Sequence, residues 1–136
     1  MRLSGLILIL ILHTAIGMGQ NLLGYDSDYI KNYIKKNHPE LVMESNFKND
    51  HYNYLKFTDG NSGSETILFF LSDKERCTSV KAIYDLSRKD ELITNLDESY
   101  RRVDENRWTD RNNGINAVIT LQDEEWFVTV SIKPDK

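Results

Sequence analysis

Two helix-forming segments, each followed by several strand-forming runs, constrain the fold of this chain more than any other feature. The first helix is expected to begin after Asp26, a residue type that commonly caps helices, and Ile30 and Ile34 then recur at helical spacing. It is expected to end at His38-Pro39, because the residue before a proline disfavours helical backbone. The pattern predicts an amphipathic helix with one face for a sheet.

The second helix is predicted to open with Ser87-x-x-Asp90, which resembles a capping box with Asp in place of Glu. Tyr100 lies beside its expected apolar stripe. The stripe consists of Leu92, Ile93, Leu96 and Val103. This segment therefore has the same amphipathic character as the first.

Seven runs rich in strand-forming residues follow these helices, four after the first and three after the second. They cover residues 41–48, 52–58, 66–71, 77–84, 106–110, 115–121 and 126–132. Asn113-Gly114 is a strong hairpin signal, since both residue types accept positive φ, and the polar stretch 59–64 suits a looser hairpin loop. Short connections of this kind predict antiparallel pairing.

The two strand blocks also resemble one another. Residues 71–80 align without a gap on residues 121–130, an offset of 50 positions, with Leu, Asp, Glu and Val identical at corresponding places. Such an offset is typical of an internal duplication, here with halves at about 20–85 and 86–136, although turns favour Asp in any case and chance is the alternative. The predicted fold is a single α+β domain over residues 20–136. Its antiparallel sheet, built from two α-β-β-β-like units, carries two helices on one face.

Residues 1–19 have the order of a secretory signal peptide. Arg2 supplies a positive charge, residues 6–12 form an unbroken apolar run, and Gly17 and Gly19 are small residues that suit cleavage near Gly19. Cleavage after Gly17 and an uncleaved anchor are the alternatives. The segment predicts export to the periplasm or beyond, without a stable membrane anchor, because the apolar run is shorter than a membrane span.

Charge and cysteine content narrow the function classes. Removal of Arg2 with the signal changes the formal net charge from −4 to −5, and an acidic chain without a basic block argues against nucleic acid as a partner. Cys77 is the only cysteine, so no internal disulfide can form and packing must supply the stability. We expect Cys77 to face the core as a small apolar residue, and the alternative is a reactive thiol.

Several short motifs resemble those of small exported proteins of unknown function in Bacteroidetes. The motifs are Asn21-Leu-Leu-Gly24, Tyr54-Leu-Lys-Phe57, Ile67-Leu-Phe-Phe-Leu-Ser-Asp73, Cys77-Thr and Glu124-Glu-Trp-Phe-Val-Thr-Val130. This resemblance covers essentially the whole mature chain and carries no activity with it. More distantly, the α-β-β-β layout is similar to the β-lactamase-inhibitor-protein fold and to small outer-membrane assembly lipoproteins. That comparison implies fold alone.

No residue pattern predicts catalysis or a bound cofactor. His38 and His51 lack a second metal ligand at helical or hairpin spacing, and residues 59–65 depart from the calcium-loop pattern at the third ligand and at the glycine. A pairing of Cys77 with a histidine is the remaining enzymatic alternative. The sequence therefore predicts a protein without enzymatic activity, metal or cofactor.

Aromatic residues on or beside the strands are the remaining functional signal. The candidates for partner binding are Tyr52, Tyr54, Trp108 and Phe127. Strand alternation directs Trp126 inward with Val128 and directs Phe127 outward. Phe127 is therefore the preferred exposed aromatic, followed by Tyr52 and Tyr54, which share a face. The alternative is that most of these aromatic side chains belong to the core.

Together these patterns predict an exported, non-enzymatic binding protein. It is expected to engage another envelope or secreted protein through its sheet face or a sheet edge. One alternative is a carrier that holds a small ligand in a pocket between the helices and the sheet. The other is a thiol enzyme that uses Cys77.

Overall fold

The computed structural model describes residues 21–135, so the predicted signal peptide lies outside the described residues. The first half contains α1 (Ser27–Asn37), β1 (Leu41–Lys48), β2 (Asn53–Asp59), β3 (Glu65–Leu71) and β4 (Cys77–Asp85). The second half contains the short 3₁₀ helix η1 (Leu86–Arg88), α2 (Lys89–Ser99), β5 (Arg101–Asp104), β6 (Arg107–Asn112), β7 (Ile115–Asp123) and β8 (Phe127–Pro134). Neither α-helix of this described part is long and apolar enough to cross a membrane.

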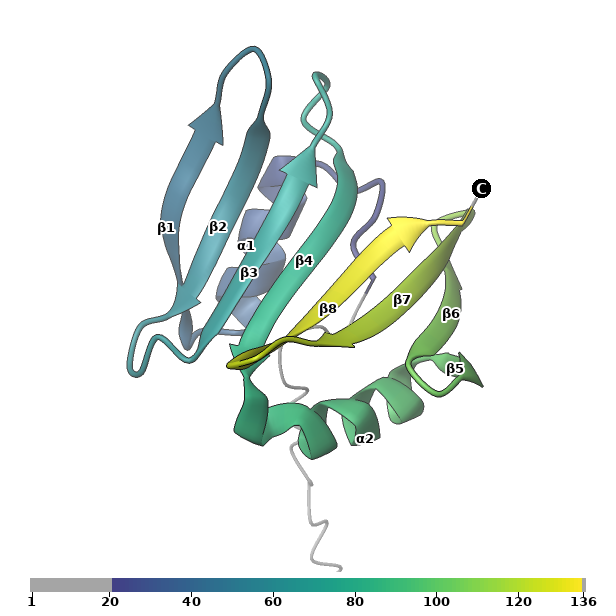
Figure 1. The fold of residues 1–136 in the computed structure, drawn as a ribbon. Coiled ribbons are helices and arrows are strands. Elements are labelled where there is room, and N and C mark those ends of the chain that lie inside the picture. Colours follow the sequence, from purple (N-terminus) through teal and green to yellow (C-terminus); the bar gives the residue numbers. More distant parts are fainter. Residues whose placement is uncertain (1–20, 136) are drawn as a thin grey trace, which may run out of the picture.

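The eight strands form one antiparallel sheet in the order β1-β2-β3-β4-β8-β7-β6-β5 (Figure 1). The prediction of an α+β fold with an antiparallel sheet and two helices is confirmed. Each half contributes four strands after its helix, one more than the three strands of the predicted α-β-β-β unit. In the second half the missed strand is β5, whose four residues are all exposed. An edge strand without a buried face lacks the apolar alternation that marks strands in a sequence.

The two halves meet where β4 pairs with β8, a boundary that we call the seam. Lys81 pairs with Ser131 at this seam, and Val80 pairs with Ile132 beside them. Lys81 and Ser131 are 50 positions apart, which is the offset between the two strand blocks, and β7 and β8 begin 50 positions after β3 and β4. Lys81 and Ser131 are therefore the one pair of corresponding residues that face each other at the seam, as expected for an approximate twofold relation between the halves.

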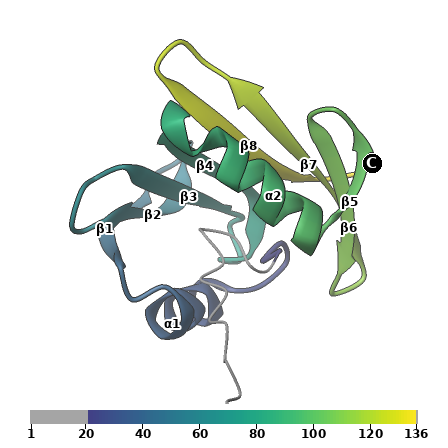
Figure 2. The ribbon, with the colours of Figure 1, turned by 90° about the horizontal axis from the view of Figure 1, so that it is seen from below.

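The core lies on one face of the sheet, which both helices cover. α1 buries Ile30 and Ile34, and α2 buries Leu92 and Leu96, in one cluster with alternate residues of the strands. The most deeply buried strand residues of this cluster are Leu55, Ile67, Phe69, Val80, Ala82, Tyr84, Trp108, Ala117, Ile119, Val128, Val130 and Ile132. In Figure 2 the strands arch over both helices. Because each buried aliphatic side chain stabilises by about 1.5–3 kcal/mol, this layer is the main source of stability.

Local hydrogen bonds explain where the helices begin. The carboxylate of Asp26 accepts a hydrogen bond from the backbone N–H of Tyr29 at 2.8 Å, as the predicted N-cap requires. The capping box predicted at Ser87 is wrong, because Ser87 lies in η1 and donates through its backbone and its hydroxyl to the Asp85 carboxylate. Arg88, at the N-cap of α2, makes no side-chain capping bond.

The second helix ends earlier than its apolar stripe predicts. The backbone at Tyr100 is extended, and Val103 lies exposed in β5. Val103 follows Leu96 by seven positions, so it matches a helical period although it belongs to a strand.

The predicted hairpin between β6 and β7 is confirmed. Asn113 and Gly114 have φ angles of 54° and 72°, the left-handed region that a tight two-residue turn uses. The looser hairpin between β2 and β3 is confirmed too, and the Asp59 carboxylate accepts a hydrogen bond there from the backbone of Asn61 at 2.8 Å.

Candidate functional site

One face of the sheet is not covered by any helix of the described residues, and we call it the open face. Alternation sends Leu55 and Phe57 to the core and Tyr54 and Lys56 to the open face, in agreement with their burial. The same alternation continues through the four strands around the seam. Their open-face residues include Thr66, Leu68, Phe70, Ser79, Lys81, Ile83, Val118, Thr120, Thr129, Ser131 and Lys133.

Three aromatic side chains cross β1, β2 and β3 on the open face, and we call Phe47, Tyr54 and Phe70 the aromatic row. The strand register places Tyr54 between Phe47 and Phe70. The rings of Phe47 and Tyr54 stack with centroids 5.3 Å apart, and those of Tyr54 and Phe70 meet edge-on at 6.1 Å. Such pairs stabilise by about 0.5–1.5 kcal/mol beyond burial. Phe47 is nevertheless 41% exposed, so the row presents apolar surface outward.

The four predicted partner-binding residues lie in three different environments. Tyr54 belongs to the aromatic row, and Phe127 is exposed on the open face at the start of β8. Tyr52 is exposed as well, but it lies in the turn before β2. Trp108 is fully buried in β6, so it is not part of the candidate surface.

Trp108 is buried because β6 turns this side chain toward α2. Its indole N–H donates a hydrogen bond to the Asp97 carboxylate at 2.8 Å, and the Arg102 guanidinium lies 5.3 Å from its ring centroid. β6 holds no second apolar residue, so alternation could not assign its face from the sequence. The prediction that Trp126 faces inward is also wrong, since Trp126 lies in the β7–β8 turn and is 77% exposed.

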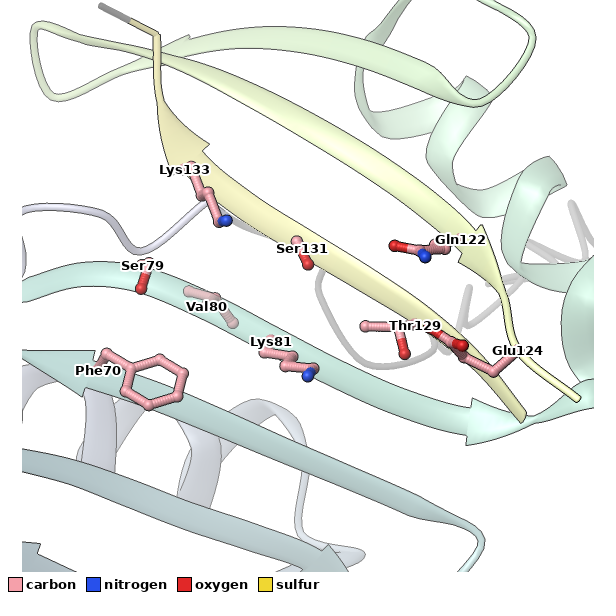
Figure 3. A pocket seen from close by; sticks show the side chains of 9 residues that line it. All are labelled: Phe70, Ser79, Val80, Lys81, Gln122, Glu124, Thr129, Ser131 and Lys133. Carbon is pink, nitrogen blue, oxygen red and sulfur yellow. The ribbon is translucent and has the colours of Figure 1, made fainter. Parts of the chain in front are cut away.

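A shallow hollow of 410 Å³ crosses the seam on the open face, and we call it the seam hollow (Figure 3). It is lined by Phe70, Ser79, Val80, Lys81, Gln122, Glu124, Thr129, Ser131 and Lys133. Phe70 also ends the aromatic row, so the two features are continuous. No motif predicts this hollow, because its lining comes from four strands and a turn that only the fold brings together.

The seam hollow is rich in hydrogen-bond donors. The ammonium groups of Lys81 and Lys133 form no ion pair with any residue in the range 21–135. Thr129 is 6% exposed, and its hydroxyl has no hydrogen-bond partner among the described residues. A buried polar group without a partner costs about 1–3 kcal/mol.

Cys77 faces the core, as expected of a small apolar residue. Burial raises the pKa of its thiol to about 12, and its Sγ donates to the Ser79 carbonyl at 3.5 Å. His38 is buried at the end of α1, where its backbone N–H donates to the Ile34 carbonyl, and His51 is exposed in a turn. A thiol that is protonated at neutral pH is a poor nucleophile.

Metal ligands do not gather in the described part of the chain. Among residues 21–135, no group of three or more His, Cys, Asp or Glu side chains could hold a metal ion.

A largely buried ion pair links the start of β3 to η1. The Glu65 carboxylate is buried, and the Arg88 guanidinium lies 3.5 Å from it and 5.3 Å from the ring centroid of Tyr84. Burial raises the pKa of Glu65 even though Arg88 opposes the shift. Burial also raises the pKa of Tyr84 well above its ordinary value, and the nearby Glu65 carboxylate adds to the effect. This cluster lies on the core side, so its role is to hold elements together.

Comparison of the chain with protein-family models, curated proteins and solved structures found no match. The resemblance to small exported proteins therefore stays a prediction. The open face, the aromatic row and the seam hollow are the features of the described residues that bear on function.

Proposed function

We propose that this chain is an exported, non-enzymatic binding protein that engages another exported protein through its open face. The aromatic row supports this proposal most strongly, because its three rings are contiguous on the open face, with Phe47 exposed and Tyr54 and Phe70 half-buried, and aromatic clusters of this kind are typical of protein-binding surfaces. Phe127 adds a further exposed aromatic side chain on the same face, beyond the seam.

The nearby sheet edge supports the same proposal. β1 is an edge strand, and Val42 and Met43 join Phe47 among its exposed apolar residues. Backbone groups on such an edge can pair with an extended segment of a partner. The bulge between Met43 and Ser45 interrupts regular pairing, which favours the face over the edge as the main contact.

Export and the absence of catalysis rest on separate observations. The order of charged, apolar and small residues in 1–19 supports export. The buried, protonated thiol of Cys77 supports a role without covalent catalysis. Core side chains occupy the layer between the helices and the sheet, which favours binding on the open face over a carrier pocket in that layer.

A capture experiment with matched variants tests the proposal. The tagged full chain is expected to recover a partner from the envelope or secreted fraction, and the Phe47→Thr/Tyr54→Thr double variant is expected to lose it. Tyr29→Thr alters an exposed aromatic residue on α1 and should retain the partner. The proposal fails if the double variant recovers the same protein, or if the wild-type chain recovers none after crosslinking.

A further inference from the structure

The seam hollow is built around equivalent residues of the two halves. Lys81 and Ser131 pair there, and Ser79 and Thr129, which are also 50 positions apart, come from opposite halves on either side of this pair. Figure 3 shows these side chains along β4 and β8, where they line the same hollow. Neither half alone could form the cavity, because its centre is the pairing between the halves.

One buried hydroxyl in the hollow, that of Thr129, lacks a partner among the described residues. Thr129 lines the cavity, yet it is 6% exposed and its Oγ1 makes no hydrogen bond with a described residue. Folded proteins pair the great majority of buried polar atoms with protein, water or ligand. A ligand oxygen that reaches Oγ1 of Thr129 from the hollow would accept a hydrogen bond from this hydroxyl.

The charge around Thr129 favours an anion. Lys81 and Lys133 line the hollow without an ion pair to a described carboxylate, and Glu124 is the one acidic residue of the lining. With two ammonium groups and one carboxylate, the lining therefore has an excess of positive charge. Hydrogen bonds from charged donors to an oxyanion are shorter and stronger than neutral ones. Phe70 adds an apolar wall next to these donors.

We propose that the seam hollow binds the oxyanion group of a small ligand, a carboxylate or a phosphate, whose apolar part lies against Phe70. Lys81 and Lys133 supply the positive charge, and Thr129 donates a hydrogen bond to an oxygen of the ligand. The volume of 410 Å³ is within the range of about 300–1,000 Å³ that is common for small-ligand pockets. This site does not require a protein partner, so it goes beyond the proposed function.

An NMR titration of the isotope-labelled full chain at constant ionic strength tests this site. The probes are inorganic phosphate, phenyl phosphate, acetate and phenylacetate. We expect saturable shifts at the backbone amides of Lys81, Thr129 and Ser131, and about tenfold tighter binding of each phenyl-bearing probe than of its parent anion, because the ring buries apolar surface on Phe70. Tighter binding of phenyl phosphate assigns a phosphate ligand, and tighter binding of phenylacetate assigns a carboxylate.

Matched variants separate a specific site from general attraction of anions. Thr129→Val and Lys81→Gln are each expected to lower the affinity for the tighter-binding phenyl-bearing probe by about tenfold. Thr129→Ser keeps the hydroxyl and should bind this probe like wild type. Lys35→Gln, at an exposed position of α1, controls for the loss of one positive charge and should also bind like wild type. The proposal is overturned if no probe gives saturable shifts at the seam, or if Thr129→Val and Lys81→Gln bind as tightly as wild type.

Discussion

Lys81 and Ser131 pair directly across the seam, although they lie 50 positions apart in the sequence. They occupy corresponding positions of the two halves, each of which is a helix followed by four strands, because β7 and β8 begin 50 positions after β3 and β4. The seam hollow surrounds this pair, and Phe70 connects the hollow to the aromatic row. Both candidate binding features therefore share the face that no described helix covers.

The unpaired hydroxyl of Thr129 should lower the stability of the free protein. Thr129→Val keeps the shape of the side chain and removes a buried polar group without a partner, so we expect the free energy of unfolding to rise by about 1 kcal/mol. Urea unfolding at constant slope measures the change. Thr120→Val, on the exposed part of the same face, is the control and should change stability by less than about 0.5 kcal/mol. A destabilised Thr129→Val variant would show that the hydroxyl is already satisfied.

The two tryptophans should differ sharply in their contribution to stability. Trp108→Ala is expected to lower the free energy of unfolding by about 3–5 kcal/mol, because it empties a fully buried site and leaves the Asp97 carboxylate without its indole donor. Trp126→Ala removes an exposed ring and is expected to change stability by less than about 0.5 kcal/mol. Chemical denaturation of both variants measures this contrast, and similar losses at the two positions would contradict the fold.

Glu65 should make stability depend on pH in a defined direction. Because burial raises the pKa of Glu65 in the folded chain, the folded state takes up this proton at a higher pH than the unfolded state does. Stability is therefore gained as the pH falls through the raised pKa, and it is lost as the pH rises through it. The Glu65→Gln variant has no ionisable group at this position, so its stability lacks this pH dependence.

Urea unfolding of the wild type and of Glu65→Gln at about pH 7 and about pH 5 measures this effect, since that interval lies above the ordinary Glu pKa. Relative to the Glu65→Gln variant, the wild type should have a higher free energy of unfolding at about pH 5 than at about pH 7. Glu98→Gln, which removes an exposed carboxylate from α2, is the control. A difference that stays constant when the series is extended to about pH 4 would contradict the raised pKa of Glu65.

Cys77 should be inert in the native protein. With its thiol buried and its pKa raised to about 12, little thiolate is present or accessible at neutral pH. A thiol-specific reagent should react slowly with the native chain and rapidly after addition of urea. Rapid stoichiometric labelling of the native chain would instead revive the thiol-enzyme alternative.

Much of the fold could be predicted because the central strands have one buried face. In β2 and β3 every second residue is buried, and this period of two is visible in the sequence. β5 was missed because it has no buried residue, and Val103 matched a helical period by position alone. The pairing of β4 with β8 joins residues far apart in the chain, and no local pattern in the sequence indicates it.

The candidate site was predictable only in part. Alternation correctly set Tyr54 opposite the buried Leu55, but nothing in the sequence showed that Phe47 and Phe70 would lie on either side of Tyr54. Trp108 was misplaced because a single apolar residue in a polar strand does not reveal which face is buried. The seam hollow depends on cross-strand neighbours, and a linear pattern does not contain them.

Site-specific crosslinking from the aromatic row determines whether a partner binds on the open face. A photoreactive amino acid replaces Tyr54 in one full chain, and in a second chain it replaces Tyr29, which lies on α1 beyond the opposite face of the sheet. If the open face is the binding surface, position 54 yields a discrete crosslinked partner and position 29 does not. Equal crosslinking from both positions, or a partner captured from position 29 alone, would contradict the claim.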